Sequence, residues 1–239
     1  MLNGVADDLS IYKYMPLNYV LSMVQHNLLT INRISSWPDV YENFILKQVY
    51  SLHDGTPIDV INQADGIFGQ CWTYLPESDA MWRIYSPDKM TVRIKTTVEK
   101  LYDALYQTDH NMADTYVGIV RYENQNNIDN YVKSLSPLSP NDFLKEVVKG
   151  AFVKRDEFNH EKEVRIVRIL DSAKTILSGP FLQFPIPVDF IDEFCIDPRA
   201  DSAIEANISS QLTALGVPNG KITKSHLYQF NANNLKFSM

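Results

Sequence analysis

A charged turn runs directly into a β-branched segment over residues 154–169, and this segment carries two carboxylates two residues apart. Side chains of a strand alternate between its faces, so Glu161, Glu163 and Arg165 are expected to share one face. Two acids this close repel each other unless a cation lies between or above them. Either Arg165 and the preceding basic pair supply that charge, or a substrate does. The simpler alternative is a solvated strand face with weak surface ion pairs.

A middle segment combines aromatic and basic residues. On the short helix expected at residues 80–85, Trp82 and Tyr85 lie three residues apart, with Arg83 on an adjacent face. A tight turn leads to the next strand, where Arg93 and Lys95 share one face. This set suits a pyrophosphate and an aromatic ring. The alternatives are a solvated basic face and, for Trp82, a core position.

The first expected strand, residues 11–14, places Lys13 between Tyr12 and Tyr14. Lys13 or Tyr14 aimed into a pocket would hold a phosphate or stack on a ring. An ordinary half-buried strand is the alternative.

Composition describes an ordinary soluble globular chain of 239 residues, with 45% hydrophobic and 21% charged residues. The net charge of −7 gives no general attraction to nucleic acid or anionic membranes. Cys71 and Cys195 lie in apolar runs outside any zinc-ligand spacing and are expected to be buried free thiols. The start has no signal-peptide pattern, and no apolar run approaches the ~18 residues of a membrane span. We expect a cytoplasmic protein without a membrane partner.

Helical and strand patterns interleave irregularly, without a Gly-rich strand-to-helix turn, which argues against a doubly wound nucleotide-binding fold. We expect one α+β domain over residues 1–230, with a mixed, largely antiparallel sheet and flanking helices, and a tail over residues 231–239. Strands are expected at residues 28–34, 67–74, 90–96, 115–122, 181–187 and 221–228, and helices at 17–26, 98–106, 128–135, 143–152 and 201–215.

These motifs together resemble a widespread prokaryotic family catalogued as domain of unknown function 2971, in the same order over nearly the whole chain. The matching positions are residues 12–14, 42–43, 71–72, 77–85, 154–165, 198–201 and 225–228. The chain departs from the family pattern at residues 39–42, where many relatives have Asn-Asp-Pro-Phe-Glu, and at residues 88–90, where a Gly is common. The association of this family with phage-defence and mobile genes implies a toxin or defence effector, with an antitoxin or defence partner.

The order of elements and the late Glu-x-Glu also look like the ADP-ribosyltransferase layout. That resemblance implies NAD as substrate, no metal, and a protein or nucleic-acid acceptor. Glu163 would bind the nicotinamide ribose and stabilise an oxocarbenium-like state, with Glu161 as the acceptor-side acid. The ligand contacts implied are Lys13 in place of a first-strand Arg, the phosphate holders Arg83 and Arg93, and the rings of Tyr14, Trp82 and Tyr85.

Two other functions fit the same residues. One is a non-catalytic ligand- or protein-binding sensor of a defence system. The other is a metal-dependent nuclease with Glu42, Glu161 and Glu163 around Mg²⁺. The chain lacks a convincing Asp/Glu-x-Lys motif, although Glu161-Lys162-Glu163 is a loose relative of one.

Overall fold

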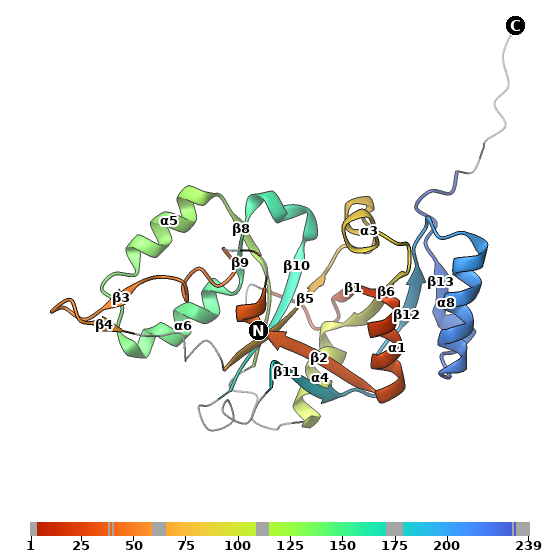
Figure 1. Ribbon diagram of the computed structural model, residues 1–239, viewed down its shortest axis with the longest axis horizontal. Coiled ribbons are helices and arrows are strands. Elements are labelled where there is room, and N and C mark those ends of the chain that lie inside the picture. Colours follow the sequence, from red (N-terminus) through yellow and green to blue (C-terminus); the bar gives the residue numbers. More distant parts are fainter. Residues whose placement is uncertain are drawn as a thin grey trace, which may run out of the picture.

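The computed structural model describes residues 4–37, 39, 41–58, 66–108, 115–170, 179–230 and 232. It confirms an α+β fold (Figure 1). Most of the expected tail, residues 231–239, lies outside the described residues.

The helices are α1 (Leu17–His26), α3 (Asp79–Tyr85), α4 (Val98–Thr108), α5 (Gln125–Ser134), α6 (Pro140–Gly150) and α8 (Ser202–Ala214), with the 3-10 turns η1 (Ile34–Ser36), η3 (Asp156–Glu161) and η4 (Asn219–Lys221). The strands are β1 (Ser10–Pro16), β2 (Leu28–Arg33), β3 (Tyr50–Ser51), β4 (Pro57–Ile58), β5 (Ile67–Thr73), β6 (Thr91–Thr97), β7 (Thr115–Ile119), β8 (Arg121–Glu123), β9 (Val153–Arg155), β10 (Glu163–Ile169), β11 (Phe181–Pro185), β12 (Glu193–Ile196) and β13 (Ile222–Lys224).

Counted over the described residues, the main sheet has nine strands. It is largely antiparallel, as expected. One path through it runs β11-β2-β5-β1-β6-β12-β13, and β10 joins β5 to β7. Only the β12–β13 pair of this sheet is parallel among the described pairings. A second parallel pair, β8–β9, stands beside it.

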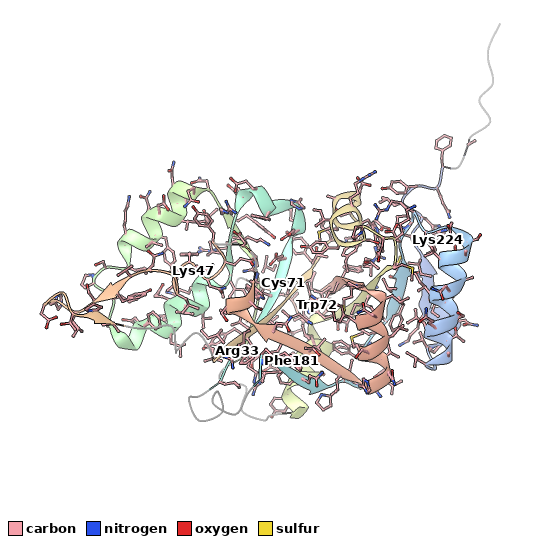
Figure 2. The ribbon with its side chains drawn as sticks, in the orientation of Figure 1. Arg33, Lys47, Cys71, Trp72, Phe181 and Lys224 are labelled. Atoms are coloured by element: carbon pink, nitrogen blue, oxygen red, sulfur yellow. The ribbon has the colours of Figure 1, made fainter. Side chains whose placement is uncertain are left out.

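Strand β5 is the branch point of this sheet. Along one edge it pairs with β10 over its whole length, from Ile67 to Thr73. Its other edge is shared: β2 pairs near Gly69, whereas β1 pairs only at Thr73. The two halves of the sheet therefore separate beside residues 70–72. The Lys13 ammonium fills part of this gap by donating to the Cys71 carbonyl oxygen at 2.8 Å. Figure 2 shows Cys71 and Trp72 near the middle of the molecule.

Two hydrophobic clusters enclose β10, whose seven residues are all buried. Val164 and Ile166 enter the larger cluster, which includes residues of α1, α4 and α8. Val167 and Ile169 face a second cluster built from η1, residues 44–46 and α6. Figure 1 shows α5 and α6 at the left and α1, α4 and α8 at the right. The Glu163–Arg165 face is therefore covered by protein, which overturns the alternative of a solvated strand face.

Several boundaries differ from the sequence prediction. Glu161 ends the turn η3 rather than belonging to the strand, because Lys162 adopts a left-handed conformation (φ 45°). The last strand is only Ile222–Lys224. The expected strand at residues 115–122 is divided into β7 and β8. Within the part of the chain that the structure describes, no helix has the length and apolar character to cross a membrane.

Candidate active site

A small cavity lies where β1 and β5 separate. Its volume is about 100 Å³, it is partly open to solvent, and it is bordered by α3, η3 and the first residue of β10. Its walls combine aromatic rings with ionisable groups: Tyr12, Lys13, Tyr14, Cys71, Trp72, Thr73, Met81, Tyr85, Glu161 and Glu163. Five of the eight residues predicted for the site therefore meet in one place: Lys13, Tyr14, Tyr85, Glu161 and Glu163.

The turn at Lys162 brings Glu161 and Glu163 to the same cavity. With a left-handed residue between them, one acid ends a 3-10 turn while the next begins a central strand. The Lys162 carbonyl oxygen accepts a hydrogen bond from the Tyr74 backbone at 3.0 Å. The Glu163 backbone N–H donates to the Tyr122 hydroxyl at 2.8 Å. The backbone on both sides of the acidic pair is therefore held in place.

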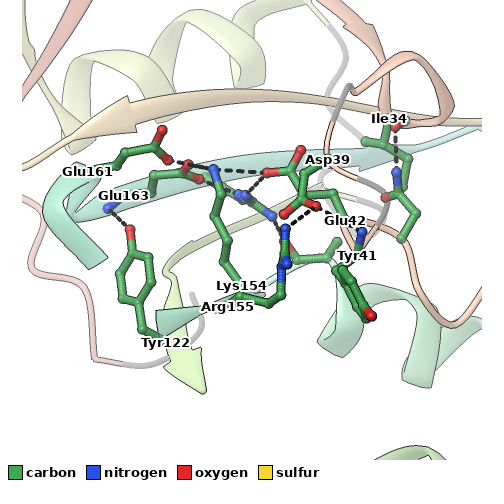
Figure 3. A network of polar contacts seen from close by, with 12 residues as sticks. Ile34, Asp39, Tyr41, Glu42, Tyr122, Lys154, Arg155, Glu161 and Glu163 are labelled. Atoms are coloured by element: carbon green, nitrogen blue, oxygen red, sulfur yellow. Dashed lines mark hydrogen bonds and ion pairs between the residues drawn. The ribbon is translucent and has the colours of Figure 1, made fainter. Parts of the chain in front are cut away.

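Lys154 lies at the centre of a buried ion network (Figure 3). Its ammonium nitrogen is 2.5 Å from Glu161 Oε2, 2.7 Å from Glu163 Oε1 and 3.2 Å from Glu42 Oε1. Arg165 completes the network with 2.5 Å contacts to Glu163 Oε2 and Glu42 Oε1. All five side chains are at most 7% exposed. Removing one member of such a group costs far more than losing a surface pair.

An aromatic ring packs against the guanidinium group of Arg165. This group lies 4.6 Å from the centre of the Trp37 ring and donates to the Ala151 carbonyl oxygen at 2.7 Å. Gly69 makes this packing possible, since a Cβ there would lie 2.8 Å from the Trp37 ring. A larger residue at position 69 would push the ring off Arg165.

The two cavity carboxyls have opposite pKa shifts. Burial alone would raise the pKa of Glu163, but the charges of Arg165 and Lys154 hold it well below its usual range. Burial and the adjacent Glu163 raise the pKa of Glu161 to about 7, against the opposing effect of Lys154. At neutral pH the site therefore combines a permanent anion with a group that exchanges protons.

Lys13 and Tyr85 are also perturbed. Burial lowers the pKa of the Lys13 ammonium, although Cys71 and Glu163 oppose the shift. Burial and the charge of Glu161 raise the pKa of the Tyr85 hydroxyl, which stays protonated and donates to Glu161 Oε1 at 2.9 Å. The Tyr85 and Tyr14 rings are stacked with centroids 6.4 Å apart. Cys71, expected to be a buried thiol, is partly exposed; it and Cys195 are free.

Trp82 and Arg93 lie behind the cavity wall. Trp82 is 0% exposed, and its indole N–H donates to Glu77 Oε1 at 2.6 Å. Arg93 is buried, paired with Glu77 at 3.4 Å and Glu193 at 3.2 Å, and stacked over Tyr12 at 5.1 Å. The Trp82 indole N–H and the two terminal guanidinium nitrogens of Arg93 are already paired within the protein, and neither residue lines the cavity, so direct contact with a ligand does not fit this structure. They support the tyrosines of β1 instead.

Arg83 lies on the exposed side of α3. Its side chain is 62% exposed and pairs with Asp79 at 2.9 Å, one helical turn away. Arg83 is not one of the described residues that line the cavity. Arg83 is reachable by a ligand that extends out of the cavity, but it does not neutralise the two acids.

The three acids considered for a nuclease do converge, but on the ammonium of Lys154. That cation takes the central position that a metal ion would need. In the ranges that the structure describes, no group of three or more His, Cys, Asp or Glu residues is arranged to hold a metal. The geometry therefore gives no support to the nuclease hypothesis.

Sequence reasoning offered Arg165 and the basic pair 154–155 as one source of the charge between the acids, and Lys154 and Arg165 do supply it; it missed part of the cavity wall. Tyr12, Cys71, Trp72, Thr73 and Met81 line the cavity without having been named as site residues. Lys154, Cys71 and Trp72 stood among the family-like motifs, so the signal was present. Their positions depend on pairings between distant strands, which local spacing does not reveal.

The structure is similar to solved structures of DarT from Thermus sp. 2.9. The complex with NAD+ is 10% identical, with 93% of this chain and 98% of that chain covered and a TM-score of 0.42. The complex with ADP-ribosylated ssDNA is 11% identical, with coverage of 94% and 98% and a TM-score of 0.41. The complex with carba-NAD+ is 10% identical, with 92% of this chain and 96% of that chain covered and a TM-score of 0.39.

In sequence, no curated protein matches the chain significantly. Residues 81–166, from within α3 to the middle of β10, match the model of the family described as "Protein of unknown function (DUF2971)". The family resemblance seen in the sequence is thus confirmed over this segment.

Proposed function

We propose that this chain is an NAD-dependent ADP-ribosyltransferase-like enzyme and that its cavity holds the nicotinamide-ribose end of NAD. The observation that carries the proposal is the pair of carboxyls in one cavity with opposite pKa shifts. Cleaving a glycosidic bond creates positive charge on the sugar, and paired carboxyls serve such reactions by dividing the stabilising and proton-transfer roles.

Glu163 is the stabilising anion in this scheme. Arg165 and Lys154 keep it ionised and fix both of its oxygens. A fixed carboxylate favours a developing oxocarbenium ion more than the neutral ribose, so its effect is larger in the transition state than in the ground state. Glu163 does not have to reorganise as the charge develops, so it stabilises the transition state through its fixed position.

Glu161 is the proton-transfer group. With a pKa of about 7 it changes protonation state close to neutral pH, which suits a general base that accepts the proton of the incoming acceptor. The Tyr85 hydroxyl and Lys154 hold one oxygen each. Glu161 is therefore oriented while it remains able to exchange a proton.

The aromatic walls suit a flat ring. Tyr14 and Tyr85 form a stacked pair beside the acids, and Trp82 supports Tyr14 edge-on at 4.7 Å. Lys13 is placed to donate to a ribose or phosphate oxygen, and the exposed Arg83 to meet the part of NAD that extends outward. The acceptor would be a protein or nucleic acid. A role as toxin or phage-defence effector, with an antitoxin or defence partner in the cytoplasm, follows from the family resemblance.

Incubation with NAD labelled on its adenylate phosphate, with and without cell lysate, tests the proposal. The wild-type protein should transfer label to a macromolecule or release nicotinamide, and Glu163→Gln should abolish most of this. Glu157→Gln is the matched control, since Glu157 is an exposed acid on the same turn. Equal activity of wild-type protein and Glu163→Gln would refute the proposed role.

A binding module is the second candidate, because one specific observation favours it. Both oxygens of Glu163 are already paired with cations, and paired charges have a weaker field at a substrate than free ones. A sensor would bind its ligand without consuming it. Calorimetric binding of NAD together with intact NAD after prolonged incubation would support the sensor and contradict the enzyme.

A further inference from the structure

Lys13 is a cavity-lining amine whose chemistry goes beyond that of the proposed transferase. Its ammonium donates to the Cys71 carbonyl oxygen at 2.8 Å, on the edge of β5 where none of the described strands pairs between the β2 and β1 pairings. The same side chain lines the cavity with Glu161 and Glu163. A lysine that lines the same pocket as a carboxyl group has the components of a carbonyl-condensing site.

The charges around the cavity allow Lys13 to be neutral. The buried network holds the acids Glu42, Glu161 and Glu163 with the bases Lys154 and Arg165. Lys13 in the adjoining cavity wall is the third base, so the six charges cancel. Moving one proton from Lys13 to Glu161 leaves two acids and two bases charged, so the total is unchanged. Burial favours the uncharged form of both groups, because it lowers the pKa of Lys13 and raises the pKa of Glu161.

Cavity size decides which molecules fit entirely beside the amine. The cavity is partly open to solvent, and its volume of about 100 Å³ is smaller than the roughly 150 Å³ cavity that holds benzene, so a ligand as large as a nicotinamide riboside would extend out of it. A molecule of about four non-hydrogen atoms, such as glycolaldehyde, fits this space.

We propose that Lys13 condenses with short aldehydes, including small open-chain hydroxyaldehydes, to form a reversible imine, with Glu161 as the acid. The neutral amine adds its electron pair to the carbonyl carbon, and the oxygen takes a proton from Glu161. One nitrogen proton returns to Glu161, which then protonates the hydroxyl so that it leaves as water. Transfer of the second nitrogen proton to Glu161 leaves a neutral carbon–nitrogen double bond and restores the acid. The step exchanges an amine and an aldehyde for an imine and water, so it requires neither an oxidant nor a reductant.

Reductive trapping on the full-length protein tests this step without NAD. Wild-type protein is treated with glycolaldehyde and cyanoborohydride at pH 6.5, and peptides are mapped by mass spectrometry over time. The exposed Lys89 and Lys133 are internal references. Lys13 should be modified at least about tenfold faster than either reference, and the difference should vanish in urea.

Modification of Lys13 no faster than Lys89 and Lys133 in the folded protein would overturn the proposal and identify Lys13 as a structural partner of the Cys71 carbonyl. Glu161→Gln should slow the reaction of Lys13 about tenfold and leave the reference lysines unchanged; an unchanged Lys13 rate would remove Glu161 from the step. Because the assay contains no NAD, its failure is distinct from failure of the transferase proposal.

Discussion

Replacement of Lys154 by methionine probes the buried ion network directly. Methionine keeps an unbranched side chain but removes the ammonium that contacts three carboxylates. Arg165 still pairs with Glu163 and Glu42. Glu161 is then left with the Tyr85 hydroxyl as its remaining partner in the network. The variant therefore concentrates the loss on one buried acid.

The size of the effect follows from burial and protonation. Breaking a buried ion pair costs about 3–5 kcal/mol, and with side chains at most 7% exposed, solvent screening reduces this little. Glu161 limits the loss by taking up a proton in the folded state. In the unfolded chain it is ionised above about pH 4.3, so each pH unit then lowers the free energy of unfolding by about 1.4 kcal/mol. From pH 6 to pH 8 the variant should lose up to about 2.7 kcal/mol, whereas the wild-type dependence on Glu161 flattens above about pH 7.

Urea unfolding followed by circular dichroism at pH 6 and pH 8 measures this. Arg83→Met is the matched control, because it removes an Arg from an exposed ion pair with Asp79 and should leave stability unchanged at both pH values. A Lys154→Met variant as stable as the wild type, or one whose loss is the same at both pH values, would refute the network's role.

Three further predictions concern individual side chains. Transferase activity of the wild type should rise as the pH passes about 7, because Glu161 ionises there. The contribution of Glu161 to stability is complete below about pH 4.3 and is lost as the pH rises from there through about 7. Glu161→Gln should remove the inflection from both the rate profile and the denaturation profile. Tyr85→Phe should move the activity inflection upward by about one pH unit, since a hydrogen bond to the ionised form is worth about 1.5 kcal/mol; an unmoved inflection would exclude that contact. Trp82→Phe should lower stability by about 1–3 kcal/mol, and the emission of Trp82 should not respond to NAD because the ring is buried behind the cavity; Trp82-dependent quenching would show that α3 opens.

Local spacing predicted those parts of the site that depend on one segment. The alternation of side chains in a strand placed Glu163 and Arg165 on one face, where they form a 2.5 Å ion pair. The same rule extended the strand back to Glu161, because it contains no information on the left-handed Lys162. Both acids still share one cavity because of the turn at Lys162, and not because side chains alternate along a strand.

Long-range pairing decided what spacing left open. Arg93 has suitable chemistry for a nucleotide, but Glu193, a hundred residues further along the chain, and Glu77 already pair with it. For Trp82 the partner is local, since its indole N–H donates to Glu77. Glu42 pairs with Arg165, which is more than a hundred residues away in sequence. The sequence therefore could not show that the second cluster covers the acidic face of the strand. Sheet type was predictable, since the irregular order of helices and strands favours antiparallel pairing.

The most direct test of the account compares nicotinamide release by the purified wild-type protein with that by Glu163→Gln, with the Kd for NAD measured in parallel. The account predicts a fall in kcat of about 10²–10³, equivalent to roughly 3–4 kcal/mol of barrier, with NAD still bound. Unchanged turnover in Glu163→Gln, or NAD bound and left intact by the wild type, would contradict it.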